Sequence, residues 1–133
     1  MEERDYLNIE HIAMYVEDLD GARVFFETYF GAISNSGYQN TITGFRSFFL
    51  SFEGGSRLEL MTRPALETGE KGHCRCGYSH LAFNVGSAER VDSMTKRLLQ
   101  DGYAVVSGPR TTGDGYYESC VMGFEGNLIE ITV

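Results

Sequence analysis

Residues 9–13 read IEHIA and residues 78–82 read YSHLA, with a histidine at the centre of each stretch. A second pair of similar stretches follows near the end of each half, FEGGSRLEL at 52–60 and FEGNLIEI at 124–131. Two separate motifs repeated in the same order indicate that one supersecondary unit occurs twice. This repeat guides the interpretation of the rest of the chain.

The residues between the motifs predict the same order of elements in both halves: a strand, a helix and then three strands. In the first half a helix begins after Asp18, carries apolar residues at three- and four-residue spacing, and ends at Gly31. Ser87 and Gly102 have the same roles in the second half. The predicted strands cover 7–16, 32–39, 43–52 and 56–62, and then 78–85, 103–107, 116–123 and 127–133.

The segment 63–77 is predicted to link the two halves, because it combines Pro64 and several glycines with alternating charges. Neither half alone buries both faces of its sheet. We therefore expect a single domain over residues 1–133, with module one at about 7–62 and module two at about 78–133. The predicted fold class is α+β, with two tandem βαβββ modules.

Composition limits the classes of function. The chain has 133 residues, 42% of them hydrophobic, and a formal net charge of −8. Without a basic run, such a chain is a poor partner for nucleic acid or an anionic membrane surface, since both require a positive patch. No apolar run approaches the roughly 18 residues of a spanning helix, and the acidic residues 1–5 are unlike a signal peptide. We expect a soluble, cytoplasmic protein whose partner is neither nucleic acid nor a membrane.

The three cysteines predict no disulfide framework, because their number is odd and Cys74 and Cys76 are close together in the chain. With His73 these two cysteines offer three potential metal donors, but no second cluster accompanies them, and we interpret the segment as an ordinary loop. Cys120 follows the pattern of a predicted strand and is interpreted as a core residue.

Each half places one histidine and one glutamate in an otherwise apolar strand. Because side chains alternate across a strand, Glu59 and Glu130 should lie on the face opposite their aliphatic neighbours, as should His11 and His80. A lone strand residue of either type is more often structural or solvated, but the matched repetition favours a shared role. Two imidazoles and two carboxylates suit a divalent metal such as Zn, Ni, Co, Mn or Fe.

These motifs resemble the vicinal-oxygen-chelate superfamily, which includes glyoxalase I, methylmalonyl-CoA epimerase, extradiol dioxygenases, fosfomycin-resistance thiol transferases and bleomycin-binding proteins. The resemblance covers residues 9–133 and is carried by EHIAMYVEDL at 10–19, RLEL at 57–60, GYSHLAF at 77–83 and the closing FEGNLIEI. Phe124-Glu125 stands where the family usually has Asp-Pro. The resemblance implies a curved eight-stranded mixed sheet around a metal that chelates two neighbouring substrate oxygens, and we also expect a homodimer.

The complete set of His11, Glu59, His80 and Glu130 resembles that of glyoxalase I, whereas the dioxygenases and fosfomycin enzymes use two histidines and one glutamate. This implies a lyase or isomerase that acts on a hemithioacetal or a related α-hydroxy-carbonyl through an enediolate. One divalent ion (Ni, Zn, Co or Mn) would be bound, with Glu130 as main base and Glu59 as its counterpart. The alternatives are an epimerase acting on a CoA ester and a non-enzymatic, drug-sequestering protein of the bleomycin-binding type.

Two positions depart from the glutathione-using glyoxalases. Those enzymes have an arginine four residues after the first histidine and an asparagine four residues after the first glutamate, where this chain has Tyr15 and Arg63. A carboxylate is best held by the paired N–H groups of an arginine. We therefore expect glutathione not to be the preferred thiol.

Overall fold

A computed structural model describes residues 7–71 and 74–133, which form two compact units that divide after Glu67. Each unit contains one copy of the repeat, and each has its own hydrogen-bonded mixed sheet and one long helix. The predicted α+β fold of two βαβββ modules is confirmed. The acidic residues 1–5, on which the sequence argument against a signal peptide rests, lie outside the described residues.

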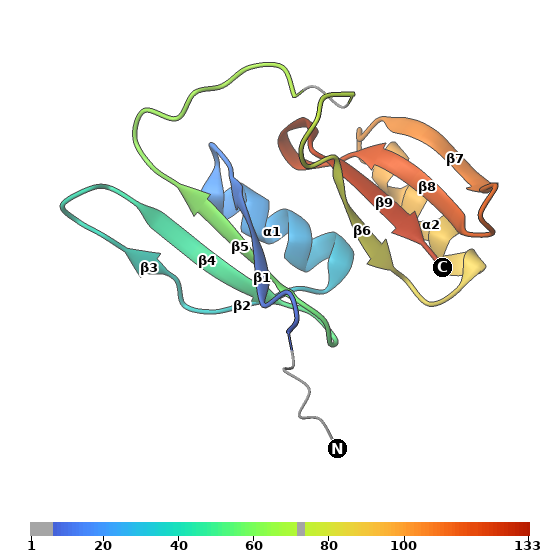
Figure 1. Cartoon of the computed structure of the whole chain (residues 1–133), viewed down its shortest axis with the longest axis horizontal. Coiled ribbons are helices and arrows are strands. Elements are labelled where there is room, and N and C mark those ends of the chain that lie inside the picture. Colours follow the sequence, from blue (N-terminus) through green and yellow to red (C-terminus); the bar gives the residue numbers. More distant parts are fainter. Residues whose placement is uncertain (1–6, 72–73) are drawn as a thin grey trace. The chain divides into compact units, whose positions relative to one another are not determined.

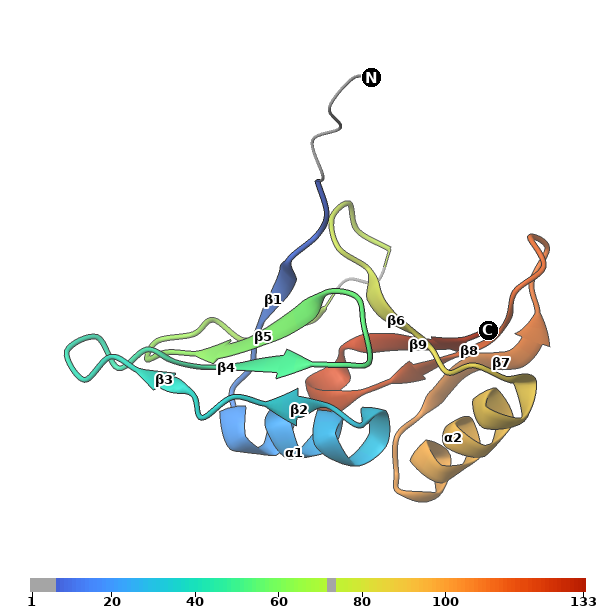
Figure 2. The same cartoon turned by 90° about the horizontal axis from the view of Figure 1, so that it is seen from below.

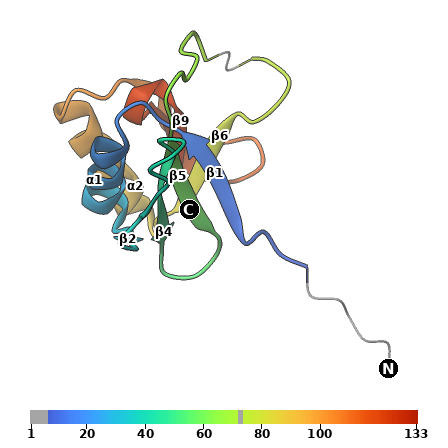
Figure 3. The ribbon, with the colours of Figure 1, turned by 90° about the vertical axis from the view of Figure 1, so that its left-hand side faces the viewer.

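The first unit is built around strand β5. Its elements are β1 (His11–Tyr15), α1 (Leu19–Phe30), β2 (Ile33–Ser34), β3 (Tyr38–Gln39), β4 (Arg46–Ser51) and β5 (Arg57–Thr62). Strand β5 pairs with β1 in parallel and with β4 in antiparallel orientation, and β4 also pairs with β2 and β3 (Figures 1 and 3). The last strand of the module therefore lies beside the first.

Helix α1 has the predicted ends and covers one face of this sheet (Figure 2). The side chain of Asp18 accepts a hydrogen bond from the Gly21 backbone N–H at 3.0 Å, and Gly31 ends the helix with φ = +65°, a conformation that glycine adopts without strain. The helix buries Leu19, Ala22, Phe25 and Phe26, and the strands bury Phe48, Leu50, Leu58 and Leu60. The opposite face of the sheet carries Glu59 together with its register partners Ala13 and Phe49.

The prediction of one continuous strand over 32–39 is wrong, because the chain forms the two short strands β2 and β3 there. Asn35 lies between them, and its Oδ1 accepts hydrogen bonds from the Phe49 backbone N–H at 3.0 Å and from Gly37 at 3.1 Å. A side-chain amide thus takes a bond that a strand would form through its backbone. Gly37, with φ = +91°, then turns the chain.

The second unit repeats this plan with β9 at its centre. Its elements are β6 (His80–Asn84), α2 (Ala88–Gln100), β7 (Val105–Thr111), β8 (Tyr117–Met122), a short 3₁₀ turn (Phe124–Gly126) and β9 (Leu128–Thr132). Strand β9 pairs in parallel with β6 and in antiparallel orientation with β8. Helix α2 lies beside the sheet of its unit (Figure 2). It contacts β8, where the buried hydroxyl groups of Thr95 and Ser119 are hydrogen-bonded at 2.7 Å.

Between Thr62 and His80, the described residues form neither a helix nor a strand, in keeping with the loop character predicted for 63–77. Ser87 accepts a hydrogen bond from the Arg90 backbone N–H and thereby begins α2 as predicted. In the described part of the chain, neither helix has the length and apolar character that crossing a membrane requires.

The core of the first unit predicts the effect of a truncation in β5. Leu60 is fully buried, so Leu60→Ala should lower the free energy of unfolding by about 2–5 kcal/mol through lost burial and the cavity left behind. Leu7 is 92% exposed, and the matched variant Leu7→Ala should change that free energy by less than about 0.5 kcal/mol. Denaturant unfolding measures both values, and equal stability of the two variants would contradict this account of the core.

Candidate metal centre

Parallel pairing of β1 with β5 positions His11 relative to Glu59 in the first unit. Ala13 is the register partner of Glu59, and His11 lies two residues before Ala13, so both side chains leave the sheet on the same face. His11 Nε2 is 3.6 Å from Glu59 Oε1. Leu58 and Leu60 are buried on the opposite face, as the alternation predicts.

The second unit forms an equivalent pair in the same register. Ala82 is the register partner of Glu130 in the parallel pair β6–β9, and His80 lies two residues before Ala82. His80 Nε2 is 2.9 Å from Glu130 Oε2. Each predicted histidine is therefore next to the predicted glutamate of its own module, although the metal-ligand role of the four residues stays a prediction.

The two pairs have similar access to solvent. The glutamate side chains are the more buried members, with 15% of Glu59 and 25% of Glu130 exposed, whereas His11 is 38% and His80 is 34% exposed. Neither pair is sealed in its core. A small ion can therefore reach the nitrogen and oxygen atoms that face each other in each unit.

Side chains of its own unit surround the His11 ring. Phe49 meets the ring edge-on with centroids 5.2 Å apart, and Glu10 Oε1 lies 3.6 Å from Nδ1. The Arg57 guanidinium lies 4.3 Å from the Phe49 ring centroid, and its Nε donates to Glu10 Oε1 at 2.8 Å. The hydrogen bond from Arg57 lowers the pKa of Glu10 from its usual value, which keeps a carboxylate beside the imidazole.

A second carboxylate lies close to Glu130. Cys120 in β8 is the register partner of Glu130, and Glu118 lies two residues before Cys120 on the same face. A hydrogen bond with Glu130, together with burial and charge repulsion, raises the pKa of Glu118 to about 7. Glu118 therefore retains a proton near neutral pH more readily than an ordinary glutamate does.

The interpretation of Cys120 as a core residue needs correction. Its strand neighbours Ser119 and Val121 are buried, whereas Cys120 is half-buried on the face that carries Glu118 and Glu130. The alternation of side chains across the strand explains the difference. Burial, followed by the charges of the two glutamates, raises the pKa of the thiol, so Cys120 is not an activated nucleophile.

The two positions that depart from the glutathione-using pattern are in contact. The Arg63 guanidinium carbon lies 5.4 Å from the centroid of the Tyr15 ring, a cation–π arrangement between the last residue of β1 and the residue that follows β5. Tyr15 is the register partner of Met61, two residues before Arg63. Arg63 therefore brings one positive charge to Tyr15, the uncharged residue at the position where the glutathione-using enzymes have an arginine.

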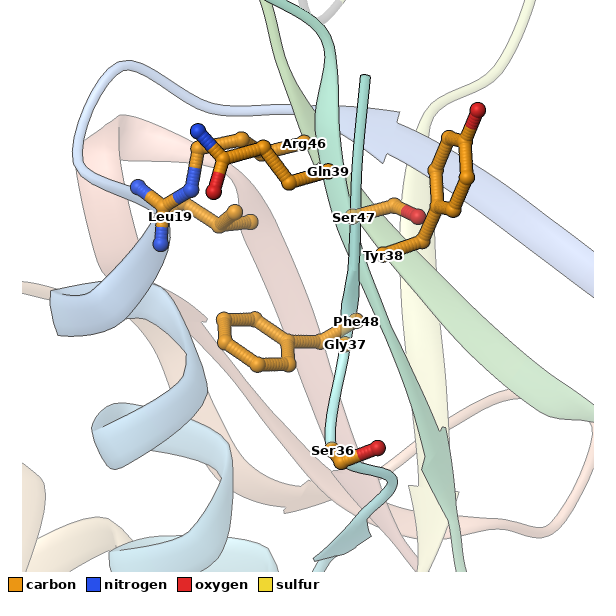
Figure 4. Close-up of a pocket in the computed structure, with 8 residues that line it drawn as sticks. All are labelled: Leu19, Ser36, Gly37, Tyr38, Gln39, Arg46, Ser47 and Phe48. Carbon is orange, nitrogen blue, oxygen red and sulfur yellow. The ribbon is translucent and has the colours of Figure 1, made fainter. Parts of the chain in front are cut away.

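The other candidate groups do not add to the site. Cys74 and Cys76 are exposed and free, while His73 lies outside the described residues. Over 7–71 and 74–133, no three His, Cys, Asp or Glu side chains come together as a metal-binding group. A small hollow near the start of α1 is lined by residues that include Leu19, Tyr38, Arg46 and Phe48, but by none of the four predicted ligands (Figure 4).

The sequence patterns did not reveal three side chains that contact the predicted ligands, Glu10, Ser79 and Glu118, nor Arg57, which contacts Glu10. Glu10 and Ser79 directly precede the two histidines, so their matched positions carried a usable signal. Glu118 could have been inferred by pairing the predicted strands 116–123 and 127–133. The contact of Arg57 with Glu10 joins two strands and requires the parallel register.

Two βαβββ modules, each with a histidine and a glutamate on adjoining parallel strands, have the architecture of the vicinal-oxygen-chelate class. A sequence profile of the Glyoxalase/Bleomycin resistance protein/Dioxygenase superfamily matches residues 8–131, nearly the whole chain. The protein belongs to this superfamily. The recognition made from the repeated motifs is thereby confirmed.

Individual relatives agree with this assignment. The chain is 33% identical over 116 residues to the uncharacterized protein YqjT of Bacillus subtilis, covering 82% of this chain and 85% of YqjT. It shares the fold of the trypanothione-dependent glyoxalase I of Leishmania major (TM-score 0.75, 17% identity, 95% and 86% coverage). It also shares the fold of the fosfomycin resistance protein FosX of Listeria monocytogenes, solved with Mn(II) and sulfate (TM-score 0.71, 20% identity, 97% and 93% coverage).

Proposed function

We propose that this protein is a metal-dependent lyase or isomerase of the glyoxalase I type, acting on a hemithioacetal or related α-hydroxy-carbonyl through an enediolate. The observation that carries the proposal is the repeated His–Glu pair, at 3.6 Å in one unit and 2.9 Å in the other. Membership of a superfamily that includes metal-bound solved proteins supports it. A cytoplasmic location and a homodimer remain predictions.

In this proposal His11, Glu59, His80 and Glu130 would be the ligands of one divalent ion. Imidazole nitrogen and carboxylate oxygen are ligands for Zn, Ni, Co and Mn, and the set contains no thiolate. In each unit the facing atoms are one Nε2 and one carboxylate oxygen, so both donors of a pair can turn to a common ion. When bound, the ion would polarise two neighbouring substrate oxygens and make the C–H between them more acidic.

The protein's own groups then move the proton. Glu130 would take it from one substrate carbon and return it to the next, with Glu59 as the counterpart on the opposite stereoisomer. Glu118 lies beside Glu130, and the pKa of Glu118 is raised to about 7. A protonated Glu118 can donate a hydrogen bond to Glu130 and thereby orient the carboxylate that acts as base.

The first test is metal binding. The parent should bind about one divalent ion per site, and His80→Ala should weaken zinc binding by more than about 100-fold, beyond the usual cost of losing an outer-shell partner. His73→Ala is the matched control and should bind zinc as the parent does. Competition against a chromophoric chelator measures the dissociation constants.

Two results would contradict the metal centre. One is a parent that binds no divalent ion, and the other is His80→Ala with parental affinity. Tight binding of a cationic drug that survives removal of metal by a chelator would favour the drug-sequestering alternative instead, since that function needs no metal.

The second test concerns the base. Glu130→Gln removes the proton acceptor but keeps an oxygen donor, so the metal-loaded variant should lose about 10²–10⁴ in turnover of a hemithioacetal. Glu89→Gln, an exposed change in the first turn of α2, should retain near-parental turnover. A metal-loaded Glu130→Gln protein as active as the Glu89→Gln control would exclude Glu130 as the base.

The third test concerns the thiol. Glutathione carries two carboxylates, whereas Tyr15 and Arg63 together provide one cation, and the net charge of −8 opposes an anionic cosubstrate. With methylglyoxal as the aldehyde, we expect kcat/KM to be lower for glutathione than for a thiol with fewer carboxylates. A value for glutathione within about 10⁴–10⁸ M⁻¹s⁻¹ and above every other thiol would contradict this expectation.

A further inference from the structure

Both candidate histidines are contacted on their second ring nitrogen by the residue that precedes them. In the first unit Glu10 Oε1 is 3.6 Å from His11 Nδ1, while Nε2 of the same ring faces Glu59. In the second unit Ser79 Oγ is 3.0 Å from His80 Nδ1, while Nε2 faces Glu130. Both histidines therefore have a partner at Nδ1, which is a carboxylate for His11 and a hydroxyl for His80.

The beginning of the strand explains how neighbouring residues can touch in this way. Successive side chains inside a strand point to opposite faces of the sheet. Strands β1 and β6 begin at His11 and His80, so Glu10 and Ser79 lie just outside them. At these strand ends the side chains of Glu10 and Ser79 turn toward the imidazole of the residue that follows.

Glu10 is itself held in place. Arg57 donates to its carboxylate through both Nε and Nη2, and the guanidinium lies over Phe49, which also contacts the His11 ring. A charge-assisted contact of this kind, joining two strands, limits the positions available to the carboxylate. Ser79 offers a neutral hydroxyl to His80 instead.

We propose that Glu10 and Ser79 are positioning residues that hold a proton on Nδ1 of His11 and His80 and so present Nε2 to the metal. This inference rests on the proposed function, since it assumes the metal centre. A neutral imidazole has one N–H, and a partner on Nδ1 determines which nitrogen keeps its lone pair. A carboxylate also makes the ring a stronger donor, so Glu10 should contribute more than Ser79.

The experiment measures zinc affinity in the full chain. Glu10→Ala and Ser79→Ala remove the contacts, Glu10→Gln keeps an oxygen without the charge, and Ser79→Thr keeps the hydroxyl. Glu27→Ala and Ser93→Ala are matched controls, because these residues lie on helices that cover the other faces of the two sheets. Competition with a chromophoric chelator gives each dissociation constant.

We expect Glu10→Ala to weaken zinc binding by about 10–100-fold, the usual cost of losing such a partner, and Ser79→Ala to weaken it by less. Glu10→Gln should be intermediate, and Ser79→Thr should restore the parental affinity. In zinc-loaded protein, proton NMR should show the Nδ1–H signals of both histidines exchanging slowly with water. Each alanine variant should lose only the slow signal of its own histidine, a pattern that general destabilisation does not produce.

The possible failures are distinguishable. A parent that binds no zinc overturns the proposed function and this inference together. If the parent binds zinc, and Glu10→Ala and Ser79→Ala both match the Glu27→Ala and Ser93→Ala controls in affinity, the positioning role alone is overturned. Failure of Ser79→Thr to restore the affinity lost in Ser79→Ala would also overturn it for Ser79.

Discussion

The parallel pairing of the first and last strand of each unit is the constraint on which the rest of the structure depends. It places β5 between β1 and β4, and β9 between β6 and β8. A central strand with neighbours on both sides must bury one of its faces under the helix, which Leu58, Leu60, Ile129 and Ile131 do. The glutamates between these residues are therefore directed to the other face.

The register of the parallel strands determines which side chains of this sheet are neighbours. In both units the glutamate pairs with an alanine two residues after the histidine, so the same diagonal relationship recurs. A shift of one residue would send the histidine to the helix-covered face and separate it from the glutamate. Alanine at this place also leaves the space between imidazole and carboxylate free of a large side chain.

The two pairs share a backbone plan but have different electrostatic surroundings. His11 is bordered by an aromatic ring, an arginine and a second carboxylate. Glu130 instead has Glu118 as a neighbour, and their hydrogen bond leaves a proton more firmly on Glu118. Sequence divergence between the modules thus lies in the residues around each pair, while the strands that hold the pair are alike.

Local patterns predicted much of this molecule, because caps and alternation act between residues close in sequence. Asp18, Gly31 and Ser87 end their helices as expected, and the repeat placed a histidine and a glutamate in matched strands. The break at Asn35 was missed, since its amide bonds to Phe49 in another strand. Such a contact has no signature in the neighbouring residues.

The sequence by itself determined the α+β modules, their superfamily and the four chemically matched side chains. Only the tertiary structure decided the pairing of His11 with Glu59 and the contact of Arg57 with Glu10. These contacts join residues far apart in the chain or on different strands. They depend on register, which is established when whole strands pair and which no local propensity encodes.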